Sequence, residues 1–402
     1  MTELFSLGDM YVSDFLKDGE DPRGGKVEMK LMLDNYGAVR LDKFADQETM
    51  YGKYWYRSGI NKTMRDELRN IVESITSVYK TKAHDIWLDI ACNDGTLLGY
   101  VPDYMYKIGI DPADDSFVEE SSKAANLLIQ DFFSAKTYNE SHVERASVVT
   151  SIAVFYDIPE REKFLRDVYD VMDDNGLWVM QLSYTPLMLK QLAFDNICHE
   201  HYYYYSLFNL KRLLNDNGFK IVDCQLNDIN GGSFRVYVMK DKGDVTLFGS
   251  QPYRDVCDFR VNSLLNYERE LQLDDPQTWM NFFSSINELK QQTVSFIKDV
   301  VGKGGIVMGY GASTKGNTLL QYFGIDNTLL TAIVERSHYK FELRTVGTNI
   351  PIISEEEMRT LRPDYLLVLP WHFINEFIER ESDFLKGGGK FIVPCPKFKI
   401  IG

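Results

Sequence analysis

The sequence has few cysteines and no long hydrophobic run. Its five cysteines are scattered and contain no CxxC pair, so neither a disulfide framework nor a cysteine zinc site is predicted. No uninterrupted apolar stretch approaches the length of a membrane span, and the first residues carry acidic groups where a signal peptide carries basic ones. We therefore expect a cytoplasmic protein in a reducing environment, with no membrane partner.

Basic residues are also in deficit. Lys and Arg number 44 against 59 Asp and Glu, which gives a formal net charge of −15. Such a charge repels polyanions at long range and argues against a nucleic-acid partner. A small anionic ligand held in a local pocket remains compatible with it. The sequence does not indicate an oligomeric state.

Short apolar runs alternate with amphipathic helical patterns along most of the chain. At 402 residues the chain exceeds the size of a single hydrophobic core, and its periodicity divides it into four parts. These are an irregular N-terminal module (1–60), a first α/β unit (61–250), a helical connector (251–302) and a second, smaller α/β unit (303–402). In both units the alternation predicts a parallel sheet with helices on its two faces, which is a Rossmann-like α/β fold.

A glycine-bearing turn, LDIACNDGTLL, follows the first buried strand of the first unit. Asp89 ends the strand, and Ala91, Asn93 and Gly95 alternate through the turn. The turn is not GxGxxG, so it is a weak match to a dinucleotide site, but its small residues let the backbone approach a ligand that lacks a pyrophosphate. Asp111, at the end of the next strand, is placed to accept hydrogen bonds from both hydroxyls of a ribose.

The stretch IQDFF adds two candidate contacts for an adenine ring. Asp131 could accept from the adenine amino group while Phe132 packs on the ring. Taken with the turn, these residues suit S-adenosylmethionine as a cofactor. The alternative is structural: Asp111 caps a helix, and IQDFF is only the end of a strand.

The stretch DNICHEHYYYYSL places two histidines around a glutamate and four tyrosines after them. It could bind a metal, transfer a proton or fill a loop. On extended backbone His199 and His201 lie on one side and Glu200 on the other, which is a poor arrangement for a shared ion. A catalytic metal also needs three protein ligands, and no other histidine has ligand spacing. We therefore predict no metal site.

Seven motifs resemble, in the same order, those of the sugar C-methyltransferases. These S-adenosylmethionine-dependent enzymes methylate a ring carbon of nucleotide-linked keto-deoxysugars. The motifs in this sequence are YWYRSG, ACNDGTLL, DNICHEHYYYYSL, NGGSFRVYV, GYGASTKGNTLLQYFGI, VGTNIPIIS and LPWHF. The resemblance implies a small N-terminal module, a class I methyltransferase domain and a C-terminal Rossmann-like domain, with a nucleoside-diphosphate sugar held between the last two.

The resemblance also implies a role for the HEH motif. Methylation of carbon requires removal of a proton next to a carbonyl, because the carbon becomes nucleophilic only as an enolate. In the family the second histidine of HEH is the proposed base, which corresponds to His201, and histidine suits proton transfer near neutral pH. Glu200 would orient the imidazole or bind a substrate hydroxyl.

Tyrosines are the candidates to stabilise the enolate. If the chain after HEH is extended, Tyr203 and Tyr205 point to the same side as His201. Tyr54 and Tyr56, in KYWYRSG, are expected to close over the same pocket as substrate-binding and catalytic residues. A phenol there could donate a hydrogen bond to the enolate oxygen.

Two positions depart from the family pattern. Leu33 and Tyr36 stand where a zinc-binding cysteine pair would fall, and the other pair is missing. The N-terminal module must therefore hold together by packing, or be partly mobile, without zinc. Asp157 stands where many relatives have a histidine, and an aspartate can replace a near-neutral acid or base only after a large pKa shift.

The second unit opens with another glycine turn, MGYGASTKGN. Gly309 and Gly311 suggest a nucleotide loop, but the third glycine is missing, and only Glu335 supports a ribose contact. We expect the turn amides and nearby side chains to hold the diphosphate of the substrate, since helix-start amides and an ammonium suit a dianion. The candidate substrate-binding residues are Ser313, Thr314, Lys315 and Asn317. The alternative is a structural turn that allows close packing of strand and helix.

The sequence therefore predicts an enzyme that transfers a methyl group from S-adenosylmethionine to the carbon next to the ketone of a nucleoside-diphosphate keto-deoxysugar. Two alternatives remain open: an NAD-binding oxidoreductase, and a catalytically inactive binding protein of the same fold. The nucleotide, the sugar and the ring carbon are not indicated.

Overall fold

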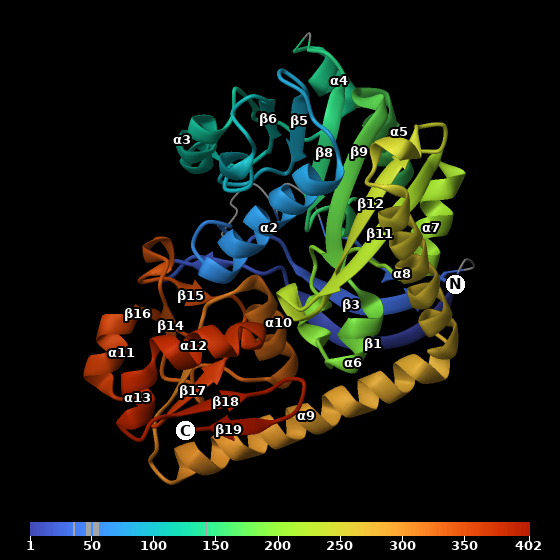
Figure 1. Cartoon of the computed structure of the whole chain (residues 1–402). Coiled ribbons are helices and arrows are strands. Elements are labelled where there is room, and N and C mark those ends of the chain that lie inside the picture. The colour runs from blue at the N-terminus through green and yellow to red at the C-terminus, as the bar shows by residue number, and fades with distance from the viewer. Residues whose placement is uncertain (35–36, 46–49, 51–55, 142) are drawn as a thin grey trace.

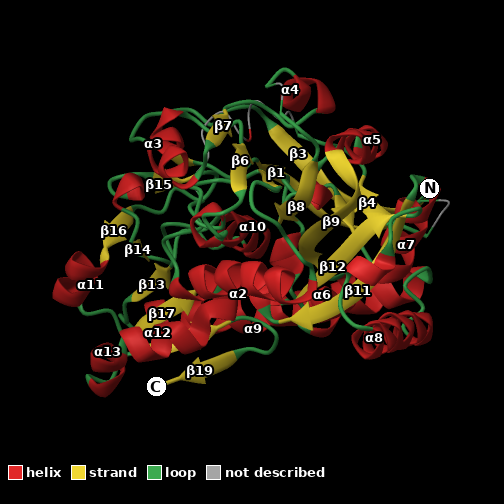
Figure 2. Cartoon of the chain, turned by 45° about the horizontal axis from the view of Figure 1, so that its top comes forward, coloured by secondary structure: helices red, strands yellow, loops and turns green. Residues whose placement is uncertain are grey.

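The computed structural model describes residues 1–34, 37–45, 50, 56–141 and 143–402. The chain forms a central α/β unit, a C-terminal α/β unit and an N-terminal antiparallel sheet (Figure 1). Figure 2 shows helices flanking the strands of both α/β units. This arrangement confirms the predicted α/β class.

The central unit is built on a seven-stranded sheet in the order β11-β12-β9-β8-β5-β6-β7. All neighbours are parallel except β12, which is antiparallel to both β9 and β11. Its strands are β5 (Ile86–Ile90), β6 (Tyr106–Ile110), β7 (Leu127–Ile129), β8 (Ala146–Ile152), β9 (Met172–Ser183), β11 (Phe219–Asn227) and β12 (Ser233–Lys240). Its helices are α2 (Lys62–Val78), α3 (Asp115–Ala124), α4 (Ala135–Asn139), α5 (Arg161–Val171), α6 (Thr185–Lys190) and α7 (Leu207–Asp216).

Strand β5 marks the point where the chain order of this sheet reverses. All five of its residues are buried, as expected for a parallel strand covered on both faces. Open α/β sheets bind ligands at the carboxyl ends of the strands on either side of such a reversal. The first glycine turn therefore lies where a ligand is expected.

The C-terminal unit repeats this plan with six strands in the order β16-β14-β13-β17-β18-β19. Only β19 is antiparallel to its neighbour. The strands are β13 (Val307–Tyr310), β14 (Ile333–Glu335), β16 (Ile352–Ser354), β17 (Tyr365–Val368), β18 (Lys390–Val393) and β19 (Lys399–Ile401). The helices are α10 (Thr314–Phe323), α11 (Glu355–Leu361), α12 (Ile374–Arg380) and α13 (Ser382–Lys386). The second glycine turn joins β13 to α10, again where the strand order reverses.

Two long helices, α8 (Gln251–Glu270) and α9 (Pro276–Gly302), connect the units. In Figure 1, α9 runs along the lower side of the molecule toward the C-terminal unit. The sequence predicted two helices here. No helix in the described part of the chain has both the length and the apolar character that a membrane crossing requires.

The N-terminal segment is not irregular, so that prediction was wrong. Strands β1 (Thr2–Tyr11), β3 (Lys26–Leu33) and β4 (Val39–Leu41) form an antiparallel sheet, and β10 (Tyr203–Tyr204) is its fourth strand. The register of β1 shifts twice, which interrupts the period-two alternation by which a strand is recognised. Leu33, at one family cysteine position, is buried, and Tyr36 lies outside the described residues.

The N-terminal segment also contacts the C-terminal unit. Strand β2 (Phe15–Leu16) pairs with β15 (Arg344–Thr345). Because β10 comes from the HEH region and β15 from the C-terminal unit, the N-terminal residues hold both units together through packing and backbone hydrogen bonds.

Candidate active site

A cavity of about 380 Å³ lies at the carboxyl ends of β5, β6 and β8. Its wall combines residues of the first glycine turn with Glu200 and His201 and with the start of α10. Segments more than a hundred residues apart in sequence therefore meet around one space.

The first glycine turn presents its backbone closely to this cavity. Ala91, Asn93 and Gly95 have φ angles of 60°, 52° and 76°, in the left-handed region. Gly95 is not in the cavity wall. A Cβ there would lie 2.8 Å from the Cα of Ser121 on α3, so its glycine is required by packing beneath the turn.

Two aspartates fix the shape of the turn. The carboxylate of Asp89 accepts a hydrogen bond of 2.6 Å from Thr150 Oγ1, and burial raises its pKa to about 7. The carboxylate of Asp111 accepts bonds of 2.8 Å from the backbone N–H groups of Asn93 and Ala113. Burial raises the pKa of Asp111 also.

Most of the residues predicted to bind S-adenosylmethionine lie around this cavity. Asp89, Ala91, Asn93, Asp111 and Phe132 all line the cavity, which supplies carboxylates for ribose hydroxyls and an aromatic face for a base.

Asp131, the predicted adenine contact, lies outside the cavity wall. Its side chain is exposed, accepts a 2.7 Å bond from the N–H of Phe132 and does not line the cavity. The strand before it, β7, is only three residues long, so the side chain turns back on its own loop.

The residues just before α2 cover the turn. Asn93 Oδ1 accepts a 3.0 Å bond from the N–H of Ser58, and Asn93 Nδ2 donates a 3.0 Å bond to the carbonyl of Tyr56. Tyr56 lines the cavity, and its hydroxyl is buried without a hydrogen-bond partner among the described residues. Burial raises the pKa of this phenol. Tyr54 lies outside the described residues.

His201 presents a neutral imidazole to the cavity. Its Nδ1 lies 2.8 Å from the carbonyl oxygen of Asn196, at the end of a short 3₁₀ helix, Phe194–Asn196. A carbonyl only accepts hydrogen bonds, so Nδ1 carries the hydrogen and Nε2 keeps a lone pair. Burial, and then the nearby charge of Lys315, lower the pKa of His201 to about 3.

Two carboxyl groups lie in the same wall. Burial raises the pKa of Glu200 to about 7. Burial and the charge of Glu200 raise the pKa of Asp157 well above its ordinary value, and Asp157 Oδ1 has no partner among the described residues. The pKa of Asp157 is thus shifted in the direction that an aspartate needs to act as an acid or base near neutral pH.

The HEH segment is a turn and not a strand, which corrects the predicted sides of its residues. Glu200 and His201 both line the cavity, whereas His199 does not. Burial lowers the pKa of His199 to about 4. In the described part of the chain, no group of three or more His, Cys, Asp and Glu side chains is arranged to hold a metal ion.

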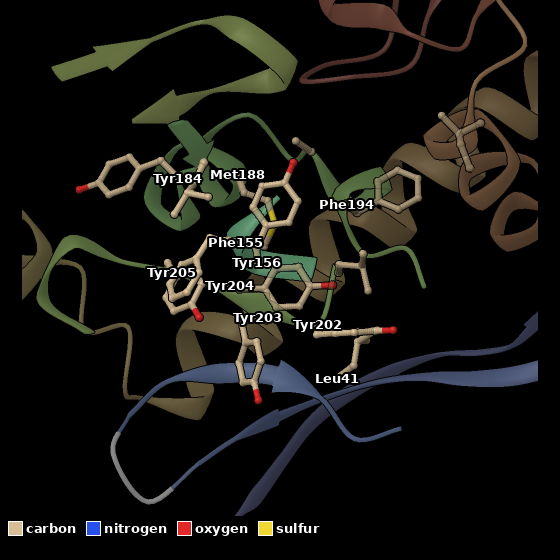
Figure 3. Close-up of a cluster of buried hydrophobic side chains, with 14 of the residues drawn as sticks. Leu41, Phe155, Tyr156, Tyr184, Met188, Phe194, Tyr202, Tyr203, Tyr204 and Tyr205 are labelled. Atoms are coloured by element: carbon tan, nitrogen blue, oxygen red, sulfur yellow. The ribbon is translucent and has the colours of Figure 1, made fainter. Parts of the chain in front are cut away.

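The tyrosine run packs away from the cavity. Tyr203 and Tyr205 do share a side, with ring centroids 6.0 Å apart, but neither lines the cavity. Tyr203 donates a 3.3 Å bond to the carbonyl of Pro159, and Tyr205 stacks on Phe155. Figure 3 shows the run between the N-terminal strands and Phe155. The alternation does not extend back to His201, because β10 begins two residues after it.

The residues predicted in the second glycine turn have different roles in the structure. Ser313 Oγ caps α10 by accepting a 2.9 Å bond from the N–H of Gly316, and Ser313 and Thr314 line a second cavity of about 150 Å³. Asn317 lines neither cavity. Its Nδ2 donates to Ser13 Oγ at 2.9 Å and to the carbonyl of Asp14, so it fastens the N-terminal module to α10.

Lys315 reaches across to the central unit. Its Nζ donates bonds of 2.5 Å to Asn196 Oδ1 and 3.3 Å to the carbonyl of Asn230. Glu335, the remaining support for a dinucleotide, accepts from the backbone N–H groups of Ala312, Arg336 and Ser337. Its carboxylate therefore stabilises the backbone of its own turn.

Sequence comparisons match both units of the chain. Residues 56–223 match the family model described as a methyltransferase domain, and residues 228–396 match the model described as the C-methyltransferase C-terminal domain. The C-methyltransferase NovU of Streptomyces niveus is 26% identical over 405 residues, which covers 99% of this chain and 94% of the relative. These matches support a C-methyltransferase.

Solved structures resemble only part of this C-methyltransferase. The plantazolicin methyltransferase BpumL, in complex with SAH, has 13% identity and a TM-score of 0.35 over 43% of this chain and 82% of its own. Magnesium protoporphyrin IX methyltransferase from Synechocystis PCC 6803, with bound SAH, has 13% identity and a TM-score of 0.36 over 46% of this chain and 90% of its own.

The cavity of this C-methyltransferase also contains residues that sequence reasoning did not select. Asn230, in the wall, and Asn196, behind His201, belong to motifs that carried the family resemblance, so those motifs contained the signal. Lys163 and Asp167 also line the wall, paired at 2.6 Å on α5. Nothing in their pattern separates them from an ordinary solvent-exposed pair.

The raised pKa of Glu200 predicts a pH-dependent effect on stability. The folded chain holds this proton up to about pH 7, whereas the ordinary pKa is 4.5. The stability that this group contributes is therefore complete below pH 4.5 and is lost as the pH rises through 7. We expect Glu200→Gln to leave thermal unfolding nearly unchanged at pH 4 and to stabilise the protein at pH 8, by on the order of 3 kcal/mol.

The exposed Glu288 of α9 provides the control for this measurement. Glu288→Gln should change the unfolding temperature little at either pH. A Glu200→Gln effect of the same size at pH 4 and pH 8 would show that the pKa of Glu200 in the folded protein is not raised.

Proposed function

We propose that this C-methyltransferase methylates the carbon next to the ketone of a nucleoside-diphosphate keto-deoxysugar. The observation that carries the proposal is the single cavity in which the S-adenosylmethionine turn, Glu200, His201 and the start of α10 meet. A cofactor site, a neutral imidazole and a second domain around one space are what α-carbon methylation of a large substrate needs. The seven motifs in family order support the sugar substrate.

The proposed reaction begins with proton removal. His201 Nε2 takes the proton from the carbon next to the ketone, and the C–H electron pair moves into the enolate. The Nδ1–H bond to Asn196 holds the ring in the tautomer that leaves Nε2 free to accept. With a pKa of about 3 the imidazole of His201 is unprotonated over the whole physiological range, but it is also a weak base, so proton removal depends on stabilisation of the enolate.

Glu200 and Tyr56 have supporting roles in this proposal. The carboxyl of Glu200, with a pKa near 7, binds a sugar hydroxyl or orients the imidazole. Tyr56 lines both cavities, and its hydroxyl, which has no partner among the described residues, is a donor for an oxygen of the sugar. S-adenosylmethionine supplies the methyl group as an electrophilic sulfonium, and the residues around it supply position.

The second cavity is the proposed site of the nucleoside diphosphate. It lies between Tyr56 and the carboxyl edge of the C-terminal sheet and is continuous in its lining with Thr314 and Lys315 of the first cavity. Ser313 and Thr314 open α10 there, and a helix start presents backbone N–H groups to an anion. Arg336, exposed in the same wall, adds positive charge.

The test is incubation with a panel of keto-deoxysugar nucleotides in deuterated water, with and without S-adenosylmethionine. Mass spectrometry then reports deuterium uptake next to the ketone and methyl gain separately. We expect at least one sugar to take up deuterium without the cofactor and to gain 14 mass units, about one methylene, with it. Absence of both changes across a broad panel would reject the substrate class.

A further inference from the structure

We propose that Lys315, which the C-terminal unit contributes, is a catalytic residue whose ammonium stabilises the enolate oxygen of the substrate. This inference rests on the proposed function. In this inference Lys315 contacts the reacting part of the sugar, and Ser313 and Thr314 bind the diphosphate.

The contacts of Lys315 place its ammonium at the reaction centre. Although α10 belongs to the C-terminal unit, Lys315 lines the main cavity, and Nζ bonds Asn196 and Asn230 of the central unit. An ammonium has three N–H donors. Two of them serve these bonds, and no described residue takes the third, so one N–H is left for a ligand.

Within the described part of the chain, this ammonium forms no direct ion pair with a carboxylate. No acidic group of the described chain lies within ion-pair distance of Lys315 Nζ, and both of its partners are neutral oxygens. Three buried carboxyls, Asp157, Asp195 and Glu200, feel its charge without pairing with it, and burial raises the pKa of each. A cation in a cavity with neutral partners favours an anion as ligand.

The contacts of Asn196 indicate that this anion is the enolate. Its carbonyl oxygen accepts from His201 Nδ1 and its side-chain oxygen accepts from Lys315 Nζ, so one buried residue positions both the base and the ammonium. A base that removes the α-proton and a donor that stabilises the resulting oxyanion must lie on the same two-carbon unit of the substrate. The diphosphate of a nucleotide sugar is attached further along the molecule.

The arrangement also balances charge during the step. Proton transfer to His201 creates an imidazolium and an enolate at once. Lys315 disfavours the first and favours the second, and the enolate gains more because the third N–H can bond directly to its oxygen. Removal of one such donor from other enzymes lowers turnover by about 10²- to 10³-fold.

The experiment compares wild type with Lys315→Met, which keeps a side chain of similar length and removes its positive charge. We expect deuterium exchange next to the ketone, and kcat for methyl transfer, to fall by about 10²- to 10³-fold. The Kd values for thymidine diphosphate and uridine diphosphate, measured by calorimetry, should stay within about threefold. Lys303→Met, at the exposed end of α9, removes the same charge outside both cavities and should leave every value unchanged.

Two outcomes would overturn the assignment. If diphosphate binding weakens by tenfold or more while exchange keeps its rate, Lys315 binds the diphosphate. If neither quantity changes, Lys315 is structural. Should Lys315→Met fold poorly, Lys315→Ala with added ethylammonium serves instead, and partial recovery of exchange is expected. A wild-type protein that exchanges no keto-sugar would reject the proposed function, which is a separate result.

Discussion

Replacing His201 with asparagine is expected to slow deuterium exchange next to the substrate ketone by about 10²- to 10⁴-fold, the usual contribution of a general base. The asparagine amide can still donate a hydrogen bond to the carbonyl of Asn196, as Nδ1–H does, so the turn should keep its shape. What it lacks is the Nε2 lone pair that accepts the proton. Exchange is measured by mass spectrometry in deuterated water without S-adenosylmethionine, which separates proton removal from methyl transfer.

His84 provides a matched control. It lies in the loop before β5, outside both cavities, and has a φ of 69°, which asparagine tolerates better than most residues. His84→Asn should therefore exchange as fast as wild type. If His201→Asn also does, His201 is not the base. A loss in Glu200→Gln alone would then move that role to Glu200, whose pKa of about 7 suits it.

Replacing Gly95 with alanine is expected to weaken S-adenosylmethionine binding by more than tenfold and to destabilise the central unit by about 2–5 kcal/mol. A left-handed φ costs a residue with a Cβ about 1–2 kcal/mol, and overpacking costs about 1–3 more. Here φ is 76°, and the new Cβ would lie 2.8 Å from Ser121 Cα. Relief requires a shift of the turn or of α3, and either shift displaces the residues that line the cavity. Calorimetry with the cofactor and thermal unfolding measure the two effects.

Gly99, four residues further along, tests whether the effect is specific. A Cβ at Gly99 would meet no atom within 4 Å, and its φ is not left-handed. Gly99→Ala should therefore be neutral or slightly stabilising, by about 0.4–1 kcal/mol, through the unfolded chain. Equal losses in both variants would mean that any added methyl group in this segment is harmful, and that the turn geometry is not the reason.

Local patterns in the sequence predicted most of the fold. Buried β-branched runs, such as Ile86–Ile90, and the amphipathic helices between them depend on neighbours in sequence, and the strands formed as expected. The N-terminal sheet escaped this reasoning. Its β1 is twice out of register, and its fourth strand, Tyr203–Tyr204, comes from another part of the chain. Pairing between distant segments leaves no local period to detect.

The candidate site divides in the same way. Ala91, Asn93 and Asp111 line the cavity because a strand end and a tight turn fix where their backbone lies. Tyr205 was expected in the site from strand alternation with His201, and Asn317 because it lies in the second glycine turn, yet both pack against other segments. The direction in which a side chain points depends on which distant element fills the space beside it. A sequence motif does not contain that information.

The sequence by itself determined that this chain has two Rossmann-like units, a cofactor turn after its first buried strand and an HEH motif. Only the tertiary structure decided that Glu200 and His201 face the cavity, that Asp157 and Glu200 have raised pKa values, and that Lys315 bonds Asn196. The physical reason is the distance along the chain between the residues that determine each property. Backbone conformation follows from residues a few positions apart, whereas burial and charge at a site are set by every segment that folds around it.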